Sequence, residues 1–133
     1  MVTREDIESF LIRSEVDFQE IGDGIWLVLA SSEEHRNRPG IVVNFQPPVV
    51  VFRADIRDLP IDDEDQLQLY RRLLELNAAD LVHGAYGLEN GEVILSDTLE
   101  LENLDFSEFR ASLESLSLAI TSHLPELTLE ITE

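Results

Sequence analysis

Residues able to do acid–base or nucleophilic chemistry gather in one stretch of the sequence, HGAYGLENGEVILSDTLEL, from His83 to Leu101. A histidine can act as a general base, and Ser96 and Asp97 are the other two residue types of a catalytic triad. The phenol of Tyr86 is a second candidate partner for the histidine. A small hydrolase or isomerase that uses His83 with Asp97 or Tyr86 is therefore one hypothesis for this protein.

The same stretch has the pattern of a β-hairpin. Asn90 and Gly91 are the preferred pair for a two-residue type I′ turn, in which both residues need a positive φ. Apolar residues alternate with polar or small ones on either side of this turn, as expected for strands with one buried face. The turn predicts four opposed pairs: Glu89–Glu92, Leu88–Val93, Tyr86–Leu95 and Gly84–Asp97.

This register argues against a triad and indicates a docking surface instead. His83 and Ser96 share a face only as diagonal neighbours, and Asp97 points to the other face. Glycine inside a strand generally marks the close approach of another backbone. We therefore predict that His83, Ala85 and Gly87 face outward, beside Ile94, Ser96 and Thr98, and form part of a dimer or partner interface.

No catalytic, cofactor-binding or metal-binding residue is predicted. His35, His83 and His123 fall in three separate elements without H-x-x-H or H-x-x-x-H spacing, so a histidine zinc site is not expected. The acidic run IDDEDQ lacks the glycine and distal glutamate of a calcium loop and is expected to cap a helix. The glycines of HGAYGLENG do not form G-x-G-x-x-G. Without cysteine or lysine, thiol nucleophiles, disulfides and Schiff bases are excluded.

Composition predicts a single soluble domain over residues 1–133. The chain has 28 acidic residues, nine basic residues that are all arginine, and a net charge of -19. Such a surface repels phosphate backbones and anionic lipids, so neither nucleic acid nor a membrane is an expected partner. The start MVTREDIESF lacks the apolar core of a signal peptide. Together with the absence of cysteine, this favours a cytoplasmic protein.

The order of predicted elements is helix, four strands, helix, hairpin, helix. Thr3 caps the first helix, and Gly22-Asp23-Gly24 joins two strands between residues 17 and 32. Two further strands flank Pro47-Pro48. The last helix begins at Asp105 and ends near His123 and Pro125, and the tail 126–133 is either an edge strand or a flexible end. These elements predict an α+β domain: an antiparallel sheet of five to six strands with three helices.

The helix predicted from Asp62 to about Ala78 has leucines on more of its circumference than packing on one sheet requires. They form two adjoining stripes, and one of them is predicted to meet a second subunit. The first stripe contains Leu67, Tyr70 and Leu74. The second contains Leu69, Leu73 and Leu76, and these three residues are the predicted interface.

The segments LYRRLLELN, HGAYGLENGEVILSDTLELENLDFSEF and VVVFRADIRDLP resemble, in order and pattern, the YbjN and CesT-like branches of the type III secretion chaperone-like fold. The resemblance covers most of the chain, but its motifs mark structure and not chemistry. It implies a small acidic dimer that binds or regulates proteins without catalysis. The N-terminal half departs from the pattern in the strand around Pro47-Pro48 and in the loop EEHRNRPG.

The leading hypothesis is thus a non-enzymatic protein-binding, chaperone-like or regulatory module that acts as a homodimer and binds an unidentified protein. A small-ligand-binding regulatory domain is the first alternative, and it predicts an apolar cavity between sheet and helices. The hydrolase or isomerase is the second alternative. It predicts a concave pocket with His83 in its wall.

Overall fold

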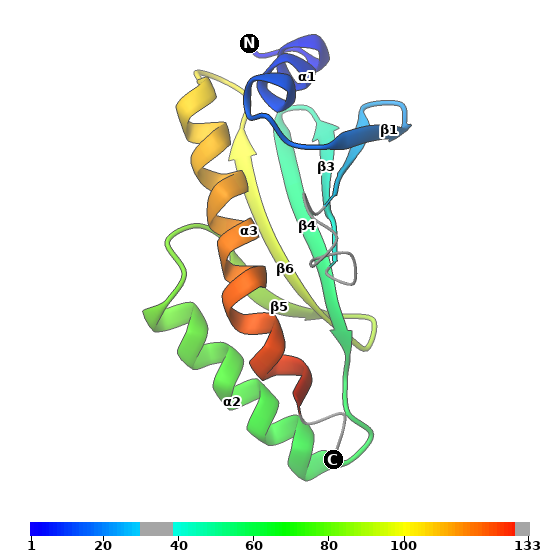
Figure 1. Cartoon of the computed structure of the whole chain (residues 1–133), viewed down its shortest axis with the longest axis vertical. Coiled ribbons are helices and arrows are strands. Elements are labelled where there is room, and N and C mark those ends of the chain that lie inside the picture. Colours follow the sequence, from blue (N-terminus) through cyan, green and yellow to red (C-terminus); the bar gives the residue numbers. More distant parts are fainter. Residues whose placement is uncertain (30–38, 130–133) are drawn as a thin grey trace.

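The computed structural model describes residues 1–29 and 39–129. Its elements follow the order expected from the sequence, from the N-terminal helix to the long C-terminal one (Figure 1). They are α1 (Arg4–Arg13), β1 (Phe18–Gly22), β2 (Ile25–Val28), β3 (Ile41–Gln46), β4 (Val49–Asp58), α2 (Asp63–Ala79), β5 (Ala85–Glu89), β6 (Glu92–Glu100) and α3 (Phe106–Leu129).

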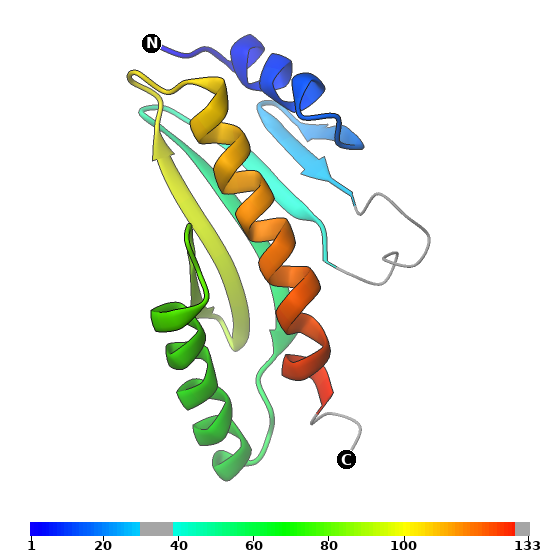
Figure 2. The same cartoon turned by 60° about the vertical axis from the view of Figure 1, so that its left-hand side comes forward.

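The described strands form one antiparallel sheet in the order β1-β2-β3-β4-β6-β5. α3 runs along one face of the sheet over β4 and β6, α1 lies across its upper end, and α2 lies beside β5 (Figures 1 and 2). This arrangement confirms the predicted α+β fold with three helices and six strands among the described residues.

The hairpin predicted around Asn90-Gly91 is present. Both turn residues have positive φ, 51° and 81°, as a type I′ turn requires. Three of the four predicted pairs, Tyr86–Leu95, Leu88–Val93 and Glu89–Glu92, occur between β5 and β6. The fourth, Gly84–Asp97, does not, because β5 begins at Ala85. The helix starts are also confirmed. Thr3 and Asp6 form a capping box at α1, and the Asp105 and Glu108 side chains each accept the other's backbone N–H at α3.

The core lies between the helices and the inner face of the sheet. Phe109 of α3 is fully buried and packs on Phe52 of β4, with ring centroids 5.1 Å apart, and on Phe10 of α1 at 5.4 Å. Aromatic pairs at this spacing contribute beyond their buried area. Phe109 therefore joins α1, α3 and the sheet at one point.

Gly84, just before β5, occupies a closely packed position that leaves no room for a side chain. Its φ is 81°, and a Cβ placed there would lie 2.7 Å from Leu116 Cδ2 and 2.8 Å from the carbonyl oxygen of Ser96. We expect Gly84→Ala to lower the free energy of unfolding by about 2–4 kcal/mol, since backbone strain and overpacking add. Urea denaturation measures this loss.

Gly91→Ala is the matched control for Gly84→Ala. Gly91 has the same φ of 81°, but nothing lies within 4 Å of its added Cβ. In this variant only backbone strain should lower the free energy of unfolding, by about 1 kcal/mol. Equal losses in the two variants would mean that the packing around Gly84 is not tight.

The prediction for the C-terminal segment is wrong in its described part. α3 continues through Pro125 to Leu129, so residues 126–129 are helical and not an edge strand. Leu127 is buried one helical turn after His123, which extends the apolar stripe of the helix. The guanidinium of Arg57 donates to the carbonyl oxygen of Leu127 over 2.7 Å and satisfies it near the helix end. Residues 130–133 lie outside the described residues.

Candidate functional site

The structure corrects the predicted interface on α2. Leu69, Leu73 and Leu76 are buried in the chain's own core, so they are not available to a partner in the folded protomer. They point inward because this stripe faces the sheet and α3. The sequence pattern did not distinguish the two stripes, since both have helical spacing.

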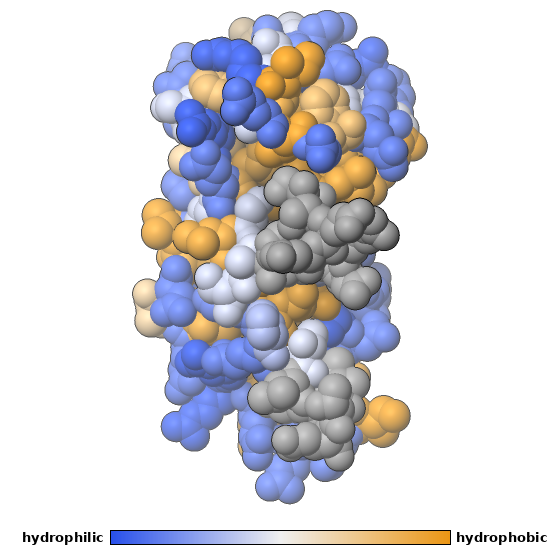
Figure 3. Space-filling model, viewed as in Figure 1, coloured by the Kyte–Doolittle hydropathy of each residue, from blue (hydrophilic) through white to orange (hydrophobic). Residues whose placement is uncertain are grey.

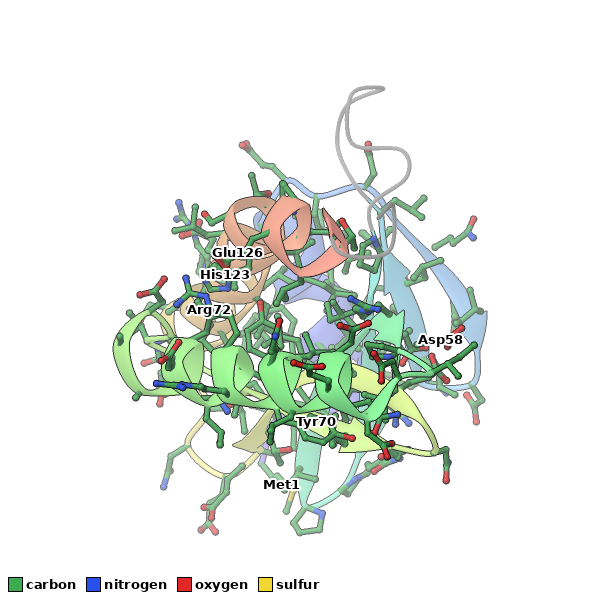
Figure 4. The ribbon with its side chains drawn as sticks, turned by 90° about the horizontal axis from the view of Figure 1, so that it is seen from below. Met1, Asp58, Tyr70, Arg72, His123 and Glu126 are labelled. Carbon is green, nitrogen blue, oxygen red and sulfur yellow. The ribbon has the colours of Figure 1, made fainter. Side chains whose placement is uncertain are left out.

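The other stripe of α2 is exposed and apolar. We call Leu67, Tyr70, Leu74 and Ala78 the outer α2 stripe; their spacing of three and four residues places them on one side of the helix. Leu67 and Leu74 are each 68% exposed. The four residues line a shallow hollow together with Arg71 and Glu75. Figure 4 shows Tyr70 on the side of α2 that faces away from α3.

The outer face of the sheet carries the small residues singled out in the sequence. Ala85 pairs with Ser96 and Gly87 with Ile94 on the face opposite α3. Near them Arg53 Nη1 bonds to Glu89 Oε1 over 2.6 Å, and Arg53 Nε bonds to Asp55 over 3.2 Å. Ala85 is exposed, whereas Gly87 is only partly exposed. The structure therefore places both residues where the register predicted, on a surface rich in polar groups.

The structure does not assemble the hypothetical hydrolase site. The backbone N–H of His83 donates to Ser115 Oγ over 3.3 Å, which ties this residue to α3. The hydroxyl of Tyr86 bonds instead to His123. Asp97 Oδ1 accepts the backbone N–H of Thr98. The three residues of the hypothesis are thus bonded to three different partners.

A polar cluster that the sequence did not predict, centred on the buried side chains of Tyr86 and His123, joins α2, β5 and α3. His123 Nδ1 lies 2.8 Å from Tyr86 Oη, and its Nε2 lies 3.3 Å from Asp80 Oδ2. Because a carboxylate only accepts, Nε2 donates to Asp80, and in the neutral ring Nδ1 accepts from the phenol. Asn77 bonds both backbone groups of Tyr86, at 2.8 and 3.1 Å. These bonds cap part of the free edge of β5, which limits pairing with another strand.

Arg72 and Glu126 close this cluster on its solvent side. The guanidinium of Arg72 forms two bonds to the Glu126 carboxylate, 2.8 and 2.9 Å long, and Figure 4 shows both residues beside His123. These bonds lower the pKa of Glu126. The cluster links residues more than 40 positions apart, so no local sequence motif could have revealed it.

The cluster is structural in character. Tyr86 is buried, and this burial, with the charges of Glu126 and Asp80, raises the pKa of its phenol well above the ordinary 10.0. A phenol that resists ionisation is a poor nucleophile and a poor base. Its bonds therefore hold β5 and the two helices together.

The raised pKa of Tyr86 predicts an alkaline loss of stability. The unfolded chain ionises its phenol near pH 10, before the folded chain does, so the contribution is complete below about pH 10 and is lost as the pH rises further. We expect the urea midpoint to fall as the pH rises from about 10 to about 11. Tyr86→Phe should flatten this fall, while Tyr70→Phe should not. An unchanged fall in Tyr86→Phe would rule out Tyr86 as its source.

A deeper hollow of about 410 Å³ opens between α3, the ends of β2 and β3, and the turn after α1. We call it the α3 groove. Its lining is Ser14, Glu15, Val16, Val28, Leu29, Pro39, Ile41, Leu113, Glu114, Ser117, Leu118, Ile120 and Thr121. Leu118 is 66% exposed and Leu29 is also exposed. Figure 3 shows that apolar side chains interrupt the hydrophilic surface on this face.

The α3 groove lies between helix and sheet, as the small-ligand hypothesis predicted, but it opens at the surface.

Among the described helices, none is long and apolar enough to cross a membrane. Within residues 1–29 and 39–129, no group of three or more histidine, aspartate or glutamate side chains is arranged to hold a metal ion.

The sequence matches the family model CesT_Tir_1 over residues 2–131. The chain belongs to this family. The match agrees with the resemblance noted in the HGAYGLENG hairpin and the helix before it. A search of curated proteins gives no significant match.

Solved structures with the same fold include chaperone complexes and a proposed regulator. A chain of the heterodimeric ExoU–SpcU complex from the type III secretion system of Pseudomonas aeruginosa is 16% identical, with a TM-score of 0.67 over 90% of this chain and 95% of that one. YbjN, a putative transcription regulator from E. coli, is 13% identical, with a TM-score of 0.62 over 91% and 90%. A chain of the Yersinia pestis chaperone SycH bound to a YscM2 fragment is 12% identical, with a TM-score of 0.58 over 90% and 98%. At these identities the likeness is one of fold.

Proposed function

We propose that this protein is a non-enzymatic, chaperone-like module that binds another protein and acts as a cytoplasmic homodimer. Membership of the CesT_Tir_1 family supports the protein-binding role. Several proteins that share the fold were solved as complexes, among them HopA1–SchA, described as a chaperone–effector complex, and ExsC–ExsE. The observation that carries the homodimer is the outer α2 stripe, an apolar surface that the protomer leaves exposed.

The outer α2 stripe has the properties of a two-fold interface. In an antiparallel pairing of two α2 helices, each apolar residue meets its equivalents on the partner, which makes the surface self-complementary. Arg71 and Glu75 flank the stripe with opposite charges, their Nε and Oε2 atoms 3.7 Å apart, so each can also meet the opposite charge across the two-fold axis. Ile61 and Val82 are also exposed just beyond the two ends of α2.

The absence of a catalytic role is part of the proposal. Neither the hollow on α2 nor the α3 groove is lined by His83, Tyr86 or His123. His123, which has hydrogen-bonded side-chain partners on both ring nitrogens, is buried. One of these partners is the phenol of Tyr86, whose pKa is raised. Surface available for protein contacts is therefore the feature that the fold offers.

The protein-binding role can be tested with a lysate from the source cell. The immobilised chain should retain a distinct protein at 0.15 M salt, whereas an unrelated domain of similar net charge should not. A retained protein must then bind the purified chain at micromolar concentration and stay soluble in its presence. If nothing is retained beyond what the acidic control retains, the proposed function fails.

A further inference from the structure

Asp97 of β6 carries a carboxylate on the inner, otherwise apolar face of the sheet. Alternation along the strand places it on the same face as Val93 and Leu95, both of which are fully buried. Its Oδ1 accepts the backbone N–H of Thr98 over 3.0 Å. Its Oδ2 is buried and has no hydrogen-bond partner among the described residues. Because a buried carboxylate oxygen without a donor costs free energy, this atom needs one.

Ser112 of α3 presents a second buried polar atom of this kind. The residue is fully buried, and its Oγ also has no partner in the part of the chain that the structure describes. A hydroxyl within a helix often bonds to the carbonyl oxygen four residues earlier, as Thr128 does to Leu124 in the same helix over 2.8 Å. Ser112 does not make this bond, so its hydroxyl is free to bond a group outside the helix.

Asp97 and Ser112 face the same part of the interface between helix and sheet. A Cβ placed on Gly84 would lie 3.5 Å from Asp97 Cβ and 2.7 Å from Leu116 Cδ2. Leu116 therefore packs over the strip of β6 that contains Asp97. Ser112 precedes Leu116 by four residues, and residues at this spacing lie on one side of a helix.

Ser115 adds a third polar group beside this pair. It follows Ser112 by three residues and directly precedes Leu116, which places it on the neighbouring part of the same helix surface. Its Oγ accepts the backbone N–H of His83 over 3.3 Å. A hydroxyl can donate as well as accept, so the hydrogen of Ser115 is available to a further acceptor.

No arginine bonds to Asp97 among the residues that the structure describes. Arg110, the only basic residue in positions 73–133, bonds to Glu114 over 2.7 Å. Arg53, on the strand next to Asp97, bonds to Glu89 on the outer face of the sheet. The group that satisfies Asp97 Oδ2 must therefore be small, and it must both donate and accept hydrogen bonds.

We propose that Asp97 Oδ2, Ser112 Oγ and Ser115 Oγ bind an internal water molecule that joins β6 to α3. The water donates to the carboxylate and accepts the hydroxyl hydrogens of both serines, which gives it the about three hydrogen bonds that are typical of buried water. None of the three residues lines the outer α2 stripe or the α3 groove. The inference is thus independent of the proposed protein-binding function.

A crystal structure of the wild-type chain, at a resolution that shows ordered water, tests the site directly. It should contain a water oxygen within about 3.2 Å of both Asp97 Oδ2 and Ser112 Oγ. A direct hydrogen bond between the two side chains, or the lack of a water between them, would overturn the proposal. A cation with oxygen ligands at about 2.3–2.6 Å would overturn the assignment of the occupant as water.

A double-mutant cycle in urea tests the same link in solution. Asp97→Ala and Ser112→Ala should each lower the folding equilibrium constant. Combined, they should lower it several-fold less than the product of the two single effects, because either variant alone disrupts the bridge. Asp58→Ala with Ser112→Ala is the matched control, since Asp58 is an exposed carboxylate at the C-terminal end of β4, and these effects should simply multiply. If the Asp97 and Ser112 effects multiply as the control does, no water joins the two side chains and the proposal fails.

Discussion

Leu73→Asp is expected to unfold the protein, while Leu74→Asp leaves it folded. Leu73 is 4% exposed and belongs to the core, whereas its neighbour Leu74 is 68% exposed on the outer α2 stripe. An unpaired carboxylate among apolar side chains costs several kcal/mol in addition to the lost leucine packing. That sum is comparable to the whole stability of a typical domain, about 5–15 kcal/mol.

Circular dichroism and thermal melting measure both variants directly. Leu73→Asp should lose its cooperative transition, and Leu73→Ala should retain one with a free energy of unfolding lower by about 2–5 kcal/mol. Leu74→Asp should keep its helical signal. A folded Leu73→Asp protein with wild-type stability would contradict the orientation of α2 described above.

Phe109→Ala is expected to lower the free energy of unfolding by about 3–5 kcal/mol. The ring is fully buried and contacts Phe10 of α1 and Phe52 of β4, so its removal leaves a cavity where three elements meet. Urea denaturation of the variant gives the loss. Phe106→Ala is the control, because Phe106 is only partly buried and lies under the guanidinium of Arg13 at 4.0 Å.

The free energy of unfolding of Phe106→Ala should be lower by about 1–2 kcal/mol, because the variant loses a partly buried ring and one cation–π contact. Equal losses at the two positions would show that Phe109 does not join the helices to the sheet.

Local features of the fold could be predicted because short-range chemistry determines them. Asn90-Gly91 requires a tight turn, and alternation around it sets which side chains of β5 and β6 face each other. Thr3 and Asp105 satisfy backbone N–H groups that every helix start leaves open. Each of these signals lies within a few residues, and each is found in the structure.

Features that depend on how elements pack could not be predicted in this way. The two stripes of α2 have the same spacing, and only the position of the sheet decides that Leu73 is inside and Leu74 outside. Leu127 fits a strand pattern and a helical stripe equally well until α3 is seen to continue. The bond between Tyr86 and His123 joins residues 37 positions apart, and the α3 groove is assembled from several elements.

The molar mass of the protein in solution tests the central proposal most directly. Size-exclusion chromatography with light scattering at micromolar concentration should give twice the 15.1 kDa of one chain for the wild type. Leu67→Ser combined with Leu74→Ser should give 15.1 kDa with an unchanged circular dichroism spectrum, since it removes the apolar centre of the outer α2 stripe but no core residue. A monomeric wild type, or a folded double variant that remains dimeric, would contradict a homodimer formed through this stripe.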